Sequence, residues 1–158
     1  MRYACTLMFV ACLACGLWAQ PAATTQPAMT EKEAAFQQMM NNAVLSGSYS
    51  VNGSTKPPAE DHYTLGPVEK TQGDNWIFTA TLEYGGHHLP LPIELPVKWA
   101  GDTPIITVDH VSIPTLGTFT ARVMVFGDQY VGIWGVTNGK HGGQMWGHIE
   151  HPATQPAK

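Results

Sequence analysis

Seven turn signals divide the chain between residues 44 and 150 into eight short segments. Each signal combines residues that tolerate a left-handed backbone or interrupt a strand. The later signals come every 11 to 16 residues, too close together for parallel crossovers, which need an intervening helix. The sequence therefore predicts an antiparallel meander of eight strands. The turns are Asn52-Gly53, Gly73-Asp74, Gly85-Gly86, Gly101-Asp102, Pro114 to Gly117, Gly127-Asp128 and Asn138-Gly139.

Apolar residues alternate with polar ones along several segments, which predicts strands with one buried face. With 44% hydrophobic residues the chain has enough apolar material for a core. We expect the meander to curl this face inward as a barrel. The inward sets are Trp76, Phe78, Ala80, Leu82 and Tyr84; Leu89, Leu91, Ile93, Leu95, Val97 and Trp99; and Phe119, Ala121, Val123 and Val125.

Three prolines within the predicted strand from Leu89 to Trp99 share one parity: Pro90, Pro92 and Pro96. Alternate residues of a strand direct their amides to the same side, so all three missing N–H donors lie along one edge. A continuous ladder cannot form on that side. We expect this strand to border an opening or a poorly paired seam of the barrel.

One helix is predicted before the strands, from Glu31 to Asn41. Thr30 and Glu33 have the spacing of a capping box. Phe36, Met39, Met40 and Ala43 follow at helical intervals, and we expect this stripe to pack against one end or side of the barrel.

The first nineteen residues predict an export signal. Arg2 precedes an uncharged, mostly apolar run from Ala4 to Trp18, shorter than the roughly 20 residues of a membrane span. Cleavage before Gln20 would remove all three cysteines, so the mature chain would hold no disulfide and no thiol. Lipid attachment at a cysteine is the second route, because small residues precede Cys12 and Cys15 as in bacterial lipoproteins. Both routes export the protein, to the periplasm or beyond; the cysteines are Cys5, Cys12 and Cys15.

Two segments flank the predicted domain, residues 20–29 and 151–158. Both are rich in Pro, Ala, Thr and Gln, and such segments lack the apolar surface that offsets the entropy of ordering. We expect a disordered linker, one folded domain over residues 30–150, and a disordered tail.

Three segments resemble a family of exported bacterial proteins to which no activity is assigned: Leu95 to Pro104, Gly117 to Arg122, and Gly139 to Ile149. The likeness extends over roughly Leu45 to Glu150. A short capped helix followed by an eight-stranded meander also resembles the lipocalins and fatty-acid-binding proteins. That resemblance implies an all-β fold, an antiparallel meander curled into a lipocalin-like barrel.

Charge and motifs exclude several classes of function. The 8 basic and 12 acidic residues give a net charge of −4 without a basic cluster, which argues against nucleic-acid binding. No Gly-x-Ser-x-Gly motif occurs, and Asp109 and His110 are adjacent in a predicted strand, where their side chains diverge. We therefore expect no enzyme activity.

The seven histidines are the candidates for a metal site. His87 and His88 are adjacent and point to opposite faces of a strand, whereas His141, His148 and His151 lie near the C-terminus. No carboxylate or cysteine completes a closely spaced ligand set. We expect no metal and no cofactor.

The inward aromatic residues are the remaining candidate site. An eight-stranded barrel is either filled by its side chains or holds one small ligand. The prediction is a small hydrophobic or aromatic ligand, bound by Trp76, Phe78, Trp99, Tyr130 and Trp134. The alternative is a filled core that serves as a structural or protein-interaction module of the cell envelope. In either case we expect contact with a membrane only through a lipid anchor.

Overall fold

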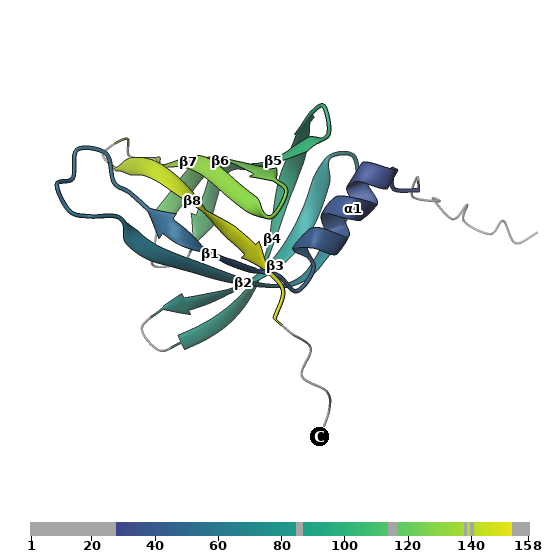
Figure 1. Cartoon of the computed structure of the whole chain (residues 1–158), viewed down its shortest axis with the longest axis horizontal. Coiled ribbons are helices and arrows are strands. Elements are labelled where there is room, and N and C mark those ends of the chain that lie inside the picture. Colours follow the sequence, from purple (N-terminus) through teal and green to yellow (C-terminus); the bar gives the residue numbers. More distant parts are fainter. Residues whose placement is uncertain (1–27, 85–86, 114–116, 138, 140, 153–158) are drawn as a thin grey trace, which may run out of the picture.

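The structure is a computed structural model that describes residues 28–84, 87–113, 117–137, 139 and 141–152, without the side chains of residues 82–91. The predicted signal, most of the linker and tail, and the turns at 85–86 and 114–116 lie outside these residues. One helix precedes eight strands (Figure 1). The elements are α1 (Glu31–Met40), β1 (Val44–Tyr49), β2 (Ala59–Lys70), β3 (Asn75–Tyr84), β4 (His87–Ala100), β5 (Thr103–Ile113), β6 (Gly117–Phe126), β7 (Gln129–Val136) and β8 (Gly142–Glu150).

The strands form a closed antiparallel barrel in sequence order, in which β8 pairs with β1. This confirms the predicted all-β meander. The inward faces are also confirmed where side chains are described, since odd positions of β4 and β6 such as Val97 and Val125 are buried, as are Trp76 and Phe78 of β3. The eight-stranded antiparallel barrel is consistent with the lipocalin-like architecture expected from the sequence.

Helix α1 covers one end of the barrel, at the right in Figure 1. Its capping box is present, because the Thr30 amide donates to Glu33 Oε2 at 2.8 Å. Phe36 and Met40 are buried in the core, as the apolar stripe predicts. The helix ends at Met40, one residue earlier than expected, because Asn41 has an extended backbone.

The end of α1 is attached to β2 where the register of β2 against β3 shifts, between Leu65 and Val68. The Val68 amide donates to Asn41 Oδ1 at 3.0 Å, and Gln37 Nε2 donates to the Val68 carbonyl at 2.8 Å. Side chains of the helix therefore hydrogen-bond to backbone groups of β2 in the irregular region.

The proline-bearing strand forms the seam that its sequence predicts. Within the described residues β4 pairs with β3 from His87 to Pro96, but with β5 only over Val97–Ala100. The Val97 amide donates to Asp74 O on the β3 side at 2.8 Å, so amides at even positions of β4 face β5. The prolines occupy those positions, and the far half of the β3–β4 hairpin projects from the barrel (Figure 1).

Candidate functional site

Three of the five predicted site residues lie beneath α1. The Phe36 ring packs edge-to-face against the rings of Trp76, Phe78 and Trp99, with centroids 5.2, 6.3 and 6.0 Å apart. We call these four residues the Phe36 cluster. Trp76 is fully buried, and its indole N–H has no partner. The helix thus supplies the ring that the other three contact. The end of the barrel beneath α1, which we call the capped end, is therefore packed as a core.

Two lysines lie over tryptophan faces at this end. Lys32 Nζ is 4.7 Å from the centre of the Trp99 ring, and Lys70 Nζ is 5.2 Å from that of Trp76. Lys70 also pairs with Glu33 at 2.8 Å. This hydrogen bond to Lys70 is the main reason why the pKa of Glu33 lies below its ordinary value.

The other two predicted residues, Tyr130 and Trp134, belong to a different group. They share the interior with Tyr49, Asp61 and Tyr63, whose side chains the sequence did not single out. We call these five residues the Asp61 cluster. Asp61 and Tyr63 have the same parity as the buried Leu65, which places them on the inner face of β2. The interior thus holds an acid that the prediction missed.

Two glycines leave the space that the Tyr130 side chain occupies. Cross-strand register sets Asp61 opposite Gly47, Gly47 opposite Gly147, and Gly147 opposite Tyr130, in one row. A Cβ at Gly47 would lie 2.5 Å from the Tyr130 hydroxyl, and one at Gly147 would lie 2.8 Å from Tyr130 Cε1. The tyrosine ring therefore lies across β8 and β1, with its hydroxyl over Gly47 and toward Asp61.

Asp61 gives the cluster an anionic character. The Tyr63 hydroxyl donates to Asp61 Oδ2 at 2.6 Å. Burial raises the pKa of Asp61, and the Tyr63 hydrogen bond and His62 oppose that change. Burial together with the Asp61 charge raises the pKa of Tyr130 to about 12 and moves the pKa of Tyr63 still higher. Both tyrosines therefore stay protonated as donors at neutral pH.

The cluster contains buried polar atoms without partners. The Tyr130 hydroxyl and the Trp134 indole nitrogen form no hydrogen bond in the described part of the chain. Trp134 packs edge-to-face against Tyr49, with centroids 6.1 Å apart. An unsatisfied buried donor costs about 1–3 kcal/mol, so these two atoms need partners from water or a ligand.

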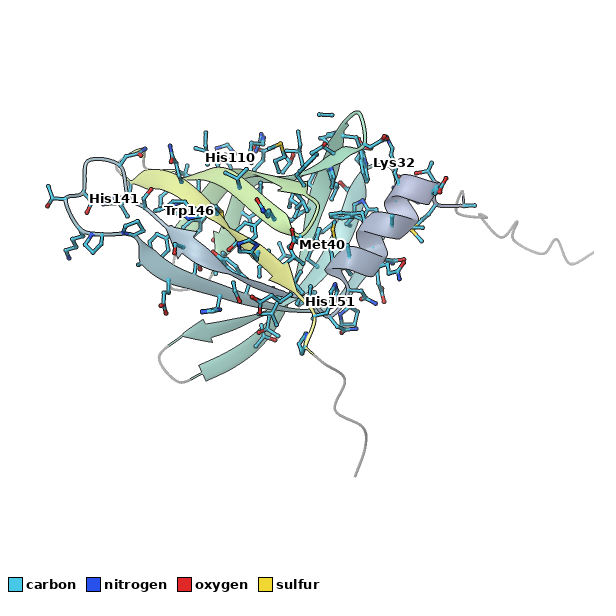
Figure 2. The ribbon with its side chains drawn as sticks, viewed as in Figure 1. Lys32, Met40, His110, His141, Trp146 and His151 are labelled. Atoms are coloured by element: carbon cyan, nitrogen blue, oxygen red, sulfur yellow. The ribbon has the colours of Figure 1, made fainter. Side chains whose placement is uncertain are left out.

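Solvent reaches this part of the interior. Tyr49, Asp61, Tyr63 and Trp134 point inward yet are only partly buried, whereas Trp76 at the capped end is fully buried. Tyr49 pairs with Ala59 beside the loop between β1 and β2, at the end opposite α1. Figure 2 shows that separation, with Lys32 on α1 and His141 at the other end. The Asp61 cluster therefore lies toward the barrel end that α1 leaves uncovered.

A second surface lies on the outside of the same strands. A groove of about 840 Å³ crosses β6, β7, β8, β1 and β2. Its apolar part is a cross-strand row of Met124, Val131 and Trp146, beside the 73% exposed Phe126. Polar side chains, including Glu60, His62 and His148, line the remainder. Trp146 points outward from β8 (Figure 2), whereas Trp134 of the neighbouring β7 points inward.

The other residues considered for catalysis, Asp109 and His110, belong to neither cluster. Asp109 pairs with Arg122 at 2.8 Å, and His110 has a positive φ where the register of β5 shifts. Across the described residues, no three His, Cys, Asp or Glu side chains gather in a way that suits a metal ion. None of the helices described there has the length and apolar character needed to cross a membrane.

Comparison of the chain with protein-family models, curated proteins and solved structures finds no match.

Proposed function

We propose that the protein is an exported, non-enzymatic binding module that takes a small ring-bearing ligand at the Asp61 cluster. The observation that supports this most directly is the pair of partnerless buried donors, the Tyr130 hydroxyl and the Trp134 indole N–H. They stand among aromatic rings in a part of the barrel that solvent reaches. The Phe36 cluster also holds one such donor, the Trp76 indole N–H, but α1 covers that end of the barrel and Trp76 is fully buried.

The chemistry of the cluster defines what would fit. Tyr49, Tyr63 and Trp134 are partly buried rings that a ligand could contact, and aromatic pairs add about 0.5–1.5 kcal/mol beyond the area they bury. The indole N–H is a donor only, so its partner must be an acceptor. A small ring-bearing molecule with one or two oxygen acceptors meets both requirements. Of the five residues predicted from sequence, this proposal keeps Tyr130 and Trp134 and assigns the other three to packing.

Tryptophan fluorescence tests the proposal directly. The full-length exported protein is titrated with a panel of apolar and aromatic compounds, and a saturable change is expected for at least one. Trp134→Phe should weaken that binding at least tenfold. Trp146→Phe is the matched control, because this indole belongs to the adjacent strand and faces outward, and it should leave the affinity unchanged.

The contrary outcome points to the alternative function. If no compound binds and Trp134→Ala destabilises as strongly as Phe36→Ala, the interior acts as a filled core. A structural or protein-interaction role then replaces the ligand-binding proposal, and the exposed apolar row in the outer groove becomes the surface to examine.

Export is the second part of the proposal. It rests on the apolar run from Ala4 to Trp18 and on the likeness of three segments to exported bacterial proteins. Mass spectrometry of the protein from its native host distinguishes the routes. An N-terminus at Gln20 supports cleavage and release, and a lipid-modified Cys12 or Cys15 supports a membrane anchor. An uncleaved Met1 would contradict both.

A further inference from the structure

We infer that the Asp61 cluster selects an organic cation: a small ammonium compound whose positive charge lies beside the Asp61 carboxylate and whose carbon groups contact the aromatic rings. This inference rests on the proposed function and adds to it the charge of the ligand. Three features of the described residues support it.

The first feature is an incomplete set of partners around the acid. Tyr63 donates to Asp61 Oδ2, and no hydrogen bond to Oδ1 is formed within the described residues. None of the described lysines or arginines pairs with this carboxylate. His62, the neighbouring residue that acts on the pKa of Asp61, has the opposite parity and is exposed on the outer face. Charges that are buried in proteins are ordinarily paired with an opposite charge or hydrogen-bonded. The free side of Asp61 thus lacks the charge partner that an ammonium group would supply.

The second feature is the set of rings around the acid. Tyr63 and Tyr130 interact electrostatically with Asp61, and Tyr63 does so with Tyr49 and Tyr130. Trp134 completes the group through its contact with Tyr49. Cations are attracted to the faces of Trp and Tyr, and aromatic cages of this composition recognise quaternary ammonium groups.

The third feature is a contrast within the same barrel. At the capped end, Lys32 and Lys70 supply the cations that lie over Trp99 and Trp76. In the described part of the Asp61 cluster, four rings and one carboxylate stand together with no lysine or arginine over a ring. Among the described residues, lysines thus lie over the rings of one aromatic group and not over those of the other, where the acid lies.

The remaining donors define the rest of the ligand. Tyr130 is 1% exposed, and its hydroxyl is directed toward Asp61 across Gly47. This hydroxyl has no hydrogen-bond partner among the described residues. The Trp134 N–H needs an acceptor. An ammonium compound that also carries a hydroxyl or carbonyl oxygen satisfies both the acid and these donors. Hydroxylated aryl-ethylamines are the corresponding ring-bearing class, and amino alcohols share their charge and their oxygen without the ring.

The test uses pairs of compounds that share shape and differ in charge. Choline is compared with dimethylbutanol, in which carbon replaces the charged nitrogen, and tyramine is compared with tyrosol, in which a hydroxyl replaces the ammonium group of the same phenol. Binding to the full-length exported protein is measured by isothermal titration calorimetry at neutral pH. We expect at least one cation to bind at least tenfold more tightly than its uncharged counterpart.

Asp61→Asn should abolish that preference. The amide oxygen still accepts the Tyr63 hydrogen bond, so the variant removes the charge and keeps the local packing. The uncharged compound should bind the variant and the original protein equally well. Asp102→Asn, in the exposed turn between β4 and β5, removes the same charge far from the cluster and should preserve the preference.

The outcomes of these experiments distinguish cation selection from the ligand-binding function on which it rests. If uncharged compounds bind as tightly as the cations, or if Asp61→Asn keeps the preference, cation selection is wrong and the binding module stands. If no compound of either kind binds here and the aromatic panel also fails, both proposals fail. Circular dichroism of Asp61→Asn confirms that a lost preference does not reflect a lost fold.

Discussion

The two ends of the barrel interior hold similar aromatic residues in different surroundings. In the Phe36 cluster, a helix inserts a ring among three others and two lysines lie over the tryptophan faces. In the Asp61 cluster, two tyrosines lie next to a partly buried carboxylate that no described lysine or arginine pairs with. Both clusters hold buried donors without partners in the described part of the chain, one at Trp76 and two at Tyr130 and Trp134. The same residue types thus stabilise the fold at one end and leave interactions available at the other. Aromatic content alone therefore does not distinguish a core from a site.

The largest expected difference between the ends is in packing. Phe36→Ala should lower the free energy of unfolding by about 3–5 kcal/mol, because it empties a fully enclosed position among three rings. Trp134→Ala should cost roughly 1–2 kcal/mol, because that ring is only partly buried. Urea denaturation of the two variants measures both values. Equal losses would remove the distinction between the two clusters.

Substitution of a glycine beside the Tyr130 ring should have the next largest effect on stability. Gly47→Ala is expected to destabilise the protein by about 1–3 kcal/mol, because the new Cβ would collide with the Tyr130 hydroxyl and the Trp146 carbonyl. Gly66→Ala is the control, since its Cβ would meet Thr79 atoms at an ordinary 3.5 Å or more. Thermal unfolding of both variants measures this difference in stability. A tolerated alanine at Gly47 would show that the row from Asp61 to Tyr130 has free space.

Substitution of Asp61 is expected to change the stability by less, and in the opposite direction. Its pKa is raised in the folded state, so the folded protein binds this proton more tightly than the unfolded chain. The stability that this group contributes therefore falls as the pH rises from the ordinary carboxyl pKa of 3.8 through the raised value. Asp61→Asn should stabilise the ligand-free protein at neutral pH by less than about 1 kcal/mol, because water screens the partly exposed carboxylate. The gain should disappear in acid, and a loss of stability at neutral pH would contradict this account.

The smallest effect concerns Glu33 at the capped end. Its pKa is lowered by Lys70, so its contribution is present above the ordinary carboxyl pKa of 4.5 and is lost as the pH falls through the lowered value. Glu33→Gln should cost at most about 1 kcal/mol at neutral pH and nothing in strong acid. Unfolding midpoints measured across this range should show opposite pH trends for the Glu33 and Asp61 variants. Parallel trends would show that the two acids have the same surroundings.

Most of the fold is predictable because its signals are local. A turn such as Gly101-Asp102 needs a glycine at a positive φ, and Gly101 has a φ of 64°. The prolines of β4 remove donors from one edge whatever the rest of the chain does, so the seam with β5 follows from their parity alone.

The site was only half predictable, because it depends on register across strands. Asp61 escapes notice in the sequence because its neighbours Glu60 and His62 are also polar, so the first half of β2 shows no apolar alternation. Counting back from Leu65 by twos would have placed Tyr63 and Asp61 on the inner face. Even so, only the pairing of β1 with β2 and β8 brings Asp61 into one row with Gly47, Gly147 and Tyr130. The predicted group of five aromatic residues is divided for the same reason, because parity identifies the inner face but not the depth along the barrel.

The seam between β4 and β5 has a consequence for how the native state opens. Within the described residues, seven neighbouring strand pairs are joined by five or more residue pairs, whereas β4 and β5 meet over four. Partial unfolding begins where few hydrogen bonds must break. Lys98 and Ala100, the β4 amides that face β5, are therefore expected to exchange with deuterium faster than Val123 or Val131 in the middle of the opposite ladder. A barrel that unrolls along this line would expose its interior from the side while β1 to β4 and β5 to β8 each keep their own hydrogen bonds.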